Sequence, residues 1–135
     1  MKISNDFVTN SSSTSFIISS KDGLTKENLL RAFGVSEESL LFDLYSNLYY
    51  ALKKNSIAVP DGIEIRDYLS SKGIKIDDEE DLAEIEKRYL NGEMVFCGEL
   101  DNSGDTGGMA EAFFTHESFI IVGDDFYFNA RNSIF

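Results

Sequence analysis

Oxygen-bearing side chains gather in one glycine-rich segment, residues 99–108. Glu99, Asp101 and Asp105 lie close together in it, and carboxylates on a flexible loop are ligands that Ca²⁺ and Mg²⁺ prefer. The spacing does not complete an EF-hand, because Thr106 stands where that motif needs a glycine. The same residue types are also typical of solvated turns. The segment gives an alternative hypothesis, a Ca²⁺ or Mg²⁺ site that would serve a cation-binding module or a metal-dependent hydrolase.

The chain has a single cysteine, Cys97, and a single histidine, His116. Cys97 lies in the apolar run 94–97, where a thiol is usually buried and inert, and no local signature connects it to His116. One histidine also argues against a common zinc site. Residues 104–108 lack the lysine of a Walker motif, so they do not form a phosphate-binding loop. The sequence therefore assigns no catalytic residue and favours a protein that is not an enzyme.

The charge of the chain is divided unevenly along its length. Lys and Arg number 12 against 24 Asp and Glu, which gives a formal net charge of −12. Residues 1–60 carry six acids and six bases, so all of the excess follows Pro60. Such a surface repels phosphate and anionic lipid, and we expect neither nucleic acid nor a membrane as a direct partner. A further alternative is an acidic decoy, which would present carboxylates in place of phosphates to a nucleic-acid-binding cleft.

Length and composition predict one folded domain over residues 1–135. The chain is 42% hydrophobic and 13% aromatic, which is too apolar for a disordered protein. No apolar run approaches the roughly 18 residues of a membrane-spanning helix, and the first six residues lack a signal-peptide core. A lone cysteine cannot form an internal disulfide, which favours the cytoplasm. Residues 1–15 are rich in hydroxyl groups and are expected to form an N-terminal arm.

Local signals predict the elements of the first half. The apolar run 16–18 predicts a buried strand. Thr25 and Gly34 are residue types that begin and end helices, so a helix is expected over 26–33. A longer helix is expected to begin after Ser36 and to end before Pro60. Its apolar residues recur at three- and four-residue steps: Leu40, Leu41, Leu44, Tyr45, Leu48, Tyr49 and Leu52.

The second half predicts two more helices and several short strands. Asp61, with Glu64 three residues later, predicts a helix that ends at Gly73. The acid run 77–81 predicts the start of another, which ends at Gly92. Strands are expected at 74–76, 94–97, 118–122 and 126–129, a loop at 98–108 and a helical turn or two at 109–114. The connection 123–125 begins with glycine, which suits a type II′ hairpin. This order predicts an α+β fold with a small, mainly antiparallel sheet and three or four helices.

Aromatic residues favour association over catalysis. Phe42 and Tyr50 widen the apolar stripe of the long helix over most of its girth, and such a helix is central to a core or lies in a subunit contact. Phe126, Tyr127 and Phe128 follow one another in the last strand. Tyr and Phe are favoured in interface cores. The preferred interpretation is a non-enzymatic acidic interaction protein that associates with itself or binds another protein.

The segment Asp6–Ile17 resembles the start of many small uncharacterised bacterial and phage proteins. These share a stretch of aromatic, Val, any residue, Asn, three Ser, any residue, Ser, Phe and Ile or Val, and the chain departs from it only modestly, with Thr9 and Thr14 where serine is common. The likeness covers about a tenth of the chain. It implies a bacterial or phage origin and a common leader-like element, and it implies no activity.

Overall fold

The central strand of the sheet is apolar on both of its sides. In the computed structural model, which describes residues 14–74, 76–100 and 120–133, β2 (Thr14–Ser20) buries Phe16 and Ile18 in one core and Ile17 in another. Successive side chains of a strand point to opposite faces of the sheet. A strand that is buried on both sides requires cover over both faces, and the helices provide it.

The sheet is antiparallel throughout its described strands. β2 pairs on one side with β4 (Met94–Leu100) and on the other with β6 (Phe126–Ser133). The short strands β3 (Ser56–Ala58) and β5 (Ile120–Val122) are the two edges, so the order is β3-β4-β2-β6-β5. Five antiparallel strands with the four helices of the described residues confirm the predicted small α+β domain.

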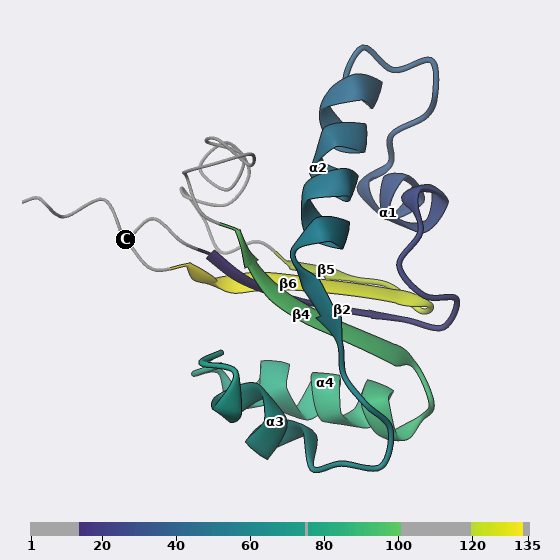
Figure 1. Ribbon diagram of the computed structural model, residues 1–135. Coiled ribbons are helices and arrows are strands. Elements are labelled where there is room, and N and C mark those ends of the chain that lie inside the picture. Colours follow the sequence, from purple (N-terminus) through teal and green to yellow (C-terminus); the bar gives the residue numbers. More distant parts are fainter. Residues whose placement is uncertain (1–13, 75, 101–119, 134–135) are drawn as a thin grey trace, which may run out of the picture.

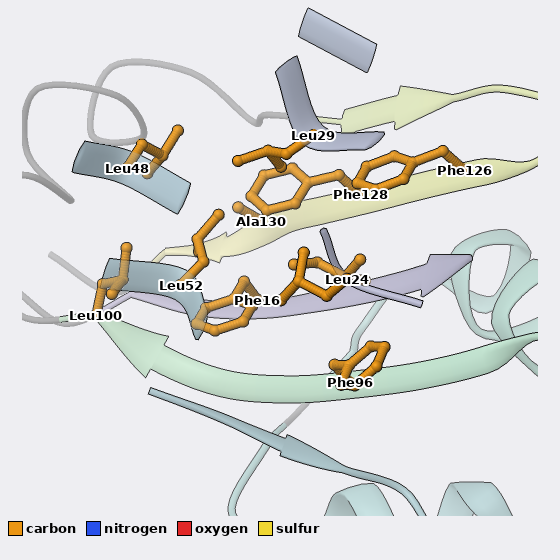
Figure 2. Packing of buried hydrophobic residues seen from close by; sticks show 11 residues of the cluster. Phe16, Leu24, Leu29, Leu48, Leu52, Phe96, Leu100, Phe126, Phe128 and Ala130 are labelled. Carbon is orange, nitrogen blue, oxygen red and sulfur yellow. The ribbon is translucent and has the colours of Figure 1, made fainter. Parts of the chain in front are cut away.

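Two helices cover each face of the sheet (Figure 1). α1 (Lys26–Phe33) and α2 (Phe42–Lys54) lie on one side, and α3 (Ile65–Ser71) and α4 (Glu79–Leu90) lie on the other. Figure 2 shows the first core, whose buried members include Phe16, Leu24, Leu29, Leu48, Leu52, Phe96, Leu100, Phe126, Phe128 and Ala130. The second core consists of Ile17, Val59, Ile65, Leu69, Ile74, Ile85, Val95, Cys97 and Tyr127.

Gly98 lets the end of α2 pack closely on β4. A Cβ atom at this position would lie 2.0 Å from the backbone oxygen of Asn55 and 2.9 Å from the ring of Phe16. Glycine in the interior of a strand often marks such a close approach of another backbone. The prediction of a loop from residue 98 onward is therefore wrong for its first three residues, because β4 continues to Leu100.

The helix signals are confirmed for α1 and need correction for α2. Thr25 caps α1 by accepting a hydrogen bond from Asn28 N, and Gly34 ends the helix in the left-handed conformation. Ser36 does not cap α2, which begins at Phe42. Residues 36–42 form turns instead, in which Ser39 N donates to Ser36 O and Phe42 N donates to Ser39 O. Leu40 and Leu41 therefore precede the helix.

Other boundaries of the second half also shift. α3 begins at Ile65, four residues after Asp61, because Glu64 is itself the cap and accepts from Arg66 N. Residues 74 and 76 are not in a strand, since Ile74 N bonds back to Leu69 O at the helix end. Strand β3 was not predicted, because a run of three residues is too short to show the alternation of polar and apolar side chains that identifies a strand.

The last hairpin forms as expected but with a different turn. β5 and β6 pair antiparallel, and Gly123 N donates to Phe126 O. The two connecting residues are therefore Asp124 and Asp125, and Gly123 does not have a positive φ. A type II′ turn with glycine first is thus wrong. β6 also runs beyond the predicted 126–129, to Ser133.

The uneven charge of the sequence becomes a difference between the two faces of the sheet. α1 and α2 come from the neutral first 60 residues, whereas α3 and α4 come from the acidic remainder. On the acidic face, Arg66 of α3 lies 3.0 Å from Glu79 and 3.3 Å from Glu86 of α4. These hydrogen bonds, to Glu86 first and then Glu79, raise the pKa of the Arg66 guanidinium above its ordinary value. The face nevertheless keeps an excess of carboxylates.

Several expectations fall outside the described residues. They are most of the N-terminal arm, residues 1–13, residues 101–108 of the predicted loop, the helical turns at 109–114 and the first two residues of the predicted strand 118–122. The remaining two arm residues, Thr14 and Ser15, belong to β2. Among the described helices, none is both long and apolar enough to cross a membrane.

Candidate functional site

Exposed apolar side chains concentrate at the start of α2. In the described part of the chain, the large hydrophobic residues that remain exposed are Leu40, Leu41, Leu44, Tyr50, Ile57, Leu90, Met94 and Val122. Half of them fall within the eleven residues from Leu40 to Tyr50, and Leu40 is 101% exposed, as much as in an extended peptide. Single exposed apolar residues are ordinary, whereas several within one short segment are a candidate for an interaction site. We call Leu40, Leu41, Leu44 and Tyr50 the α2 surface.

The α2 helix is apolar on two sides, and only one of them is used in the core. Leu48 and Leu52 are fully buried against the sheet. Leu44, four residues before Leu48 on the same helix face, is exposed, and Tyr50 is exposed on another side of the helix. The stripe is therefore wider than the core requires. The expectation that this helix lies in a core is met by Leu48 and Leu52, whereas its part in a subunit contact stays a prediction.

A groove lies beside the α2 surface, between α1 and the start of α2. It has a volume of about 430 Å³ and is lined by Lys26, Glu27, Leu30, Arg31, Val35, Ser36, Glu37 and Phe42. The Nζ atom of Lys26 lies 5.0 Å from the ring centre of Phe42 and 5.5 Å from that of Tyr50, within the range of cation–π attraction. This contact connects the groove, which we call the α1–α2 groove, to the α2 surface.

A second hollow, of about 410 Å³, lies between α1 and the β5–β6 turn. Asp22, Arg31, Asp124 and Asp125 contribute its charged groups, and all four residues are exposed. Lys21 Nζ also lies 3.6 Å from Asp125 Oδ1. The walls of the hollow also include Ala32, Ile121, Val122 and Phe126. Catalytic sites usually enclose their polar groups, whereas the charged groups of this hollow face solvent.

Arg88 is the centre of a buried polar cluster on the acidic face. Its side chain is only 7% exposed, and its Nε donates to Glu84 Oε2 at 2.7 Å. Its Nη1 donates to Glu93 Oε1 at 3.2 Å, and its Nη2 donates to the backbone oxygen of Gly123. The guanidinium carbon lies 5.1 Å from the ring centre of Tyr127. All three nitrogens of the guanidinium therefore have a partner.

This cluster joins four elements of the fold. Glu93 precedes β4, Gly123 lies at the β5–β6 turn, and Arg88 belongs to α4. Ser19 of β2 completes it, because its hydroxyl donates to Glu93 Oε1 at 2.8 Å. A buried charge is tolerated when it is paired and hydrogen-bonded, as it is here. Because its polar groups are hydrogen-bonded to one another, the cluster is suited to positioning these elements and not to chemistry on a substrate.

Cys97 has the properties of a structural thiol. It is 1% exposed within the second core, and burial raises the pKa of its thiol, although nearby Lys72 lowers it slightly. A thiol held protonated is a poor nucleophile. His116 lies outside the described residues, so the pairing with Cys97 stays a hypothesis.

The carboxylates of the metal hypothesis are described only in part. Glu99 is exposed on β4, where it pairs with Ser15 of β2, whereas Asp101 and Asp105 lie outside the described residues. Residues 14–74, 76–100 and 120–133 hold no group of three side chains that could ligate a metal ion. The Ca²⁺ or Mg²⁺ site at Glu99, Asp101 and Asp105 therefore stays a prediction.

Sequence reasoning identified the aromatic residues of α2 but missed two features. The first is the α1–α2 groove, which depends on the turn that replaces the expected helical start at Ser36. The second is the Arg88 cluster, which is assembled from residues far apart in the sequence. The one available signal for it was Glu84, four residues before Arg88 on the same helix face.

Comparisons with known proteins add no relative to this description. No protein-family model matches the chain, and no curated protein or solved structure is significantly similar to it. The function is therefore argued from the geometry of the residues themselves.

Proposed function

We propose that this chain is a non-enzymatic interaction protein that binds a protein partner through the α2 surface. The observation that supports it most directly is the exposure of Leu40, Leu41, Leu44 and Tyr50 within one short segment. Burying apolar area stabilises a complex by roughly 25 cal/mol per Å², so apolar side chains left exposed this close together in the sequence favour association.

The distribution of charge supports the same face. Interface cores are poor in charged residues and rich in aromatic ones. The α1–α2 layer comes from the neutral part of the chain, and its exposed side combines leucines with Tyr50. Residues 61–92, which contain α3 and α4, hold ten acids and five bases, so the α3–α4 layer is the more acidic of the two and the less suited to an apolar contact.

The polar groups of the described residues support a binding role over catalysis. Arg88 forms ion pairs with Glu84 and Glu93, and the Cys97 thiol is buried in an apolar core. General acids, bases and nucleophiles need access to a substrate within a cleft, and neither group has it. These features favour recognition by an apolar surface over catalysis.

Site-specific photo-crosslinking tests this proposal. A photoreactive phenylalanine analogue at position 44, on the α2 surface, is expected to form protein adducts in cells that produce the full chain. The matched control places the same analogue at position 83, since Ala83 is exposed on the opposite, acidic layer. Equal adduct yields at positions 44 and 83, or none at position 44, would remove the proposal.

A further inference from the structure

The end of α4 is closed by a turn that contains the one Asn–Gly pair of the sequence, Asn91–Gly92. The backbone N–H of Gly92 donates to Tyr89 O at 3.1 Å, and that of Glu93 donates to Arg88 O at 3.1 Å. These two hydrogen bonds are the ones that define a Schellman motif. Gly92 has a φ of 91°, a left-handed conformation that glycine adopts without strain. The motif therefore fixes the path of the chain where it leaves the helix.

Asparagine followed by glycine is the pair in which the next backbone nitrogen attacks the side-chain amide most readily, because glycine has no side chain to hinder the approach. We infer that Asn91 is a site of spontaneous covalent modification, its conversion to aspartate and isoaspartate, and that opening of the Schellman motif sets the rate. Asn91 and Gly92 are both exposed, so water reaches them. This inference does not depend on the α2 surface.

The reaction at Asn91 needs no reagent other than water. The Gly92 nitrogen gives up its proton and bonds to Cγ of Asn91, while the side-chain nitrogen of Asn91 takes up a proton and leaves as ammonia. Water then adds to the cyclic imide and breaks one of its two carbon–nitrogen bonds. Cleavage at the side-chain carbonyl gives aspartate. Cleavage at the backbone carbonyl leaves Gly92 attached through the side chain, which is isoaspartate.

The folded end of α4 opposes the first step. The N–H group that must lose its proton is already held in the hydrogen bond from Gly92 to Tyr89 O. Asn91 has a φ of −84° and a ψ of 5°, and closing the imide ring requires ψ to rotate away from this value. The motif must therefore open before the ring can close. Helix ends open locally at a lower free energy than the whole fold, so the rate of modification reports this local opening.

The two products differ in their effect on the Arg88 cluster. Residues 91–93 connect α4 to β4 (Figure 1), and the carboxylate of Glu93 lies 3.2 Å from Arg88 Nη1. Isoaspartate inserts one more carbon into the backbone just before Gly92. The bond from Glu93 N to Arg88 O and the ion pair between the same two residues then no longer fit the connection together. Aspartate leaves the backbone length unchanged and keeps both.

Peptide mass mapping of the full chain, incubated in warm and mildly alkaline buffer, tests the site and its control. Conversion at Asn91 is expected to be slower by about tenfold or more in the folded protein than in guanidinium chloride, because local opening limits it. Asn47, which is exposed on α2 and precedes Leu48, is the control within the same chain and is expected to convert far more slowly in both solvents. Equal rates at Asn91 in the two solvents would overturn the role of the motif. An unfolded chain in which Asn91 converts no faster than Asn47 would overturn the site.

Thermal unfolding of the separated products tests the consequence. The isoaspartate form is expected to melt at a lower temperature than Asn91→Asp, a variant that carries the same charge on a backbone of natural length. Asn91→Gln, whose longer side chain closes a ring much less readily, is expected to keep the natural melting temperature and to show no conversion at this position. An isoaspartate form as stable as Asn91→Asp would overturn the proposed effect on the Arg88 cluster.

Discussion

Nη1 of Arg88 lies 3.2 Å from Oε1 of Glu93, and both side chains are more than nine-tenths buried. Glu93 receives a further hydrogen bond from Ser19, so one carboxylate connects the end of α4 to the central strand. A buried ion pair is not a large source of stability in itself, but removing one partner leaves an uncompensated charge in the interior.

Arg88→Met is expected to lower the free energy of unfolding by about 3–5 kcal/mol, because the Glu93 carboxylate would lose its main partner while staying buried. Urea denaturation measures this loss. Lys87→Met is the matched control, since that neighbour is exposed and its pair with Glu84, at 3.9 Å, contributes little. Adding Glu93→Gln to Arg88→Met should recover part of the stability. A loss below about 1 kcal/mol would show that the cluster does not hold the fold together.

Gly98→Ala is expected to destabilise the protein by about 1–3 kcal/mol or more, because its Cβ would overlap the backbone oxygen of Asn55 and force α2 away from β4. Thermal unfolding checks this. Glu99→Ala, at the next and exposed position of the strand, should change the melting temperature little. Equal melting temperatures for both variants would contradict the close approach.

Ser46→Ala is expected to raise stability by about 1 kcal/mol. The Ser46 hydroxyl is buried on α2, and among the described residues it has no hydrogen-bond partner. Removing an unsatisfied buried group relieves its desolvation cost, and alanine also favours a helix. Exposed Asn47→Ala controls for helix propensity alone. A loss of stability in Ser46→Ala would mean that the hydroxyl has a partner beyond the described residues.

The pKa of the Cys97 thiol, which burial raises, gives a direction to the pH dependence of stability. In the unfolded chain the thiol ionises near its ordinary pKa of about 8.5, whereas the folded protein holds the proton to higher pH. The folded state then binds more protons, so this contribution is complete below the ordinary pKa and is lost as the pH rises through the folded value.

Two measurements check this account of Cys97. Urea denaturation at increasingly alkaline pH should show a loss of stability that is smaller in Cys97→Ala. Alkylation of the folded protein at mildly alkaline pH should be much slower than in urea. Rapid labelling of the folded chain would contradict the burial of the thiol.

Local sequence signals predicted the elements whose ends are set by neighbouring residues. α1 begins and ends where Thr25 and Gly34 indicated, because a cap acts within one turn of the helix. The apolar run 16–18, which lies in β2, was likewise identified from adjacent residues alone. The start of α2 was misplaced because Ser39 competes with the helix, its hydroxyl accepting a hydrogen bond from Leu41 N within a turn.

The features that depend on distant residues could not be derived in this way. The partners of Arg88 come from its own helix, from Glu93 and from the hairpin at Gly123, and no spacing rule connects these positions. The exposure of Leu40 was likewise hidden, because its place in an apolar stripe predicted a buried helical residue. The choice between core and contact for the α2 stripe was open in the sequence. The fold buries Leu48 and Leu52 in the core and leaves Leu44, one turn earlier on the same face, exposed.

The central claim is that the α2 surface docks a protein. The most direct measurement is the ratio of photo-adduct yields from positions 44 and 83 in the full chain within producing cells. The account predicts abundant adducts from position 44 and few from position 83. Equal yields at the two positions, or no adduct from position 44, would contradict it.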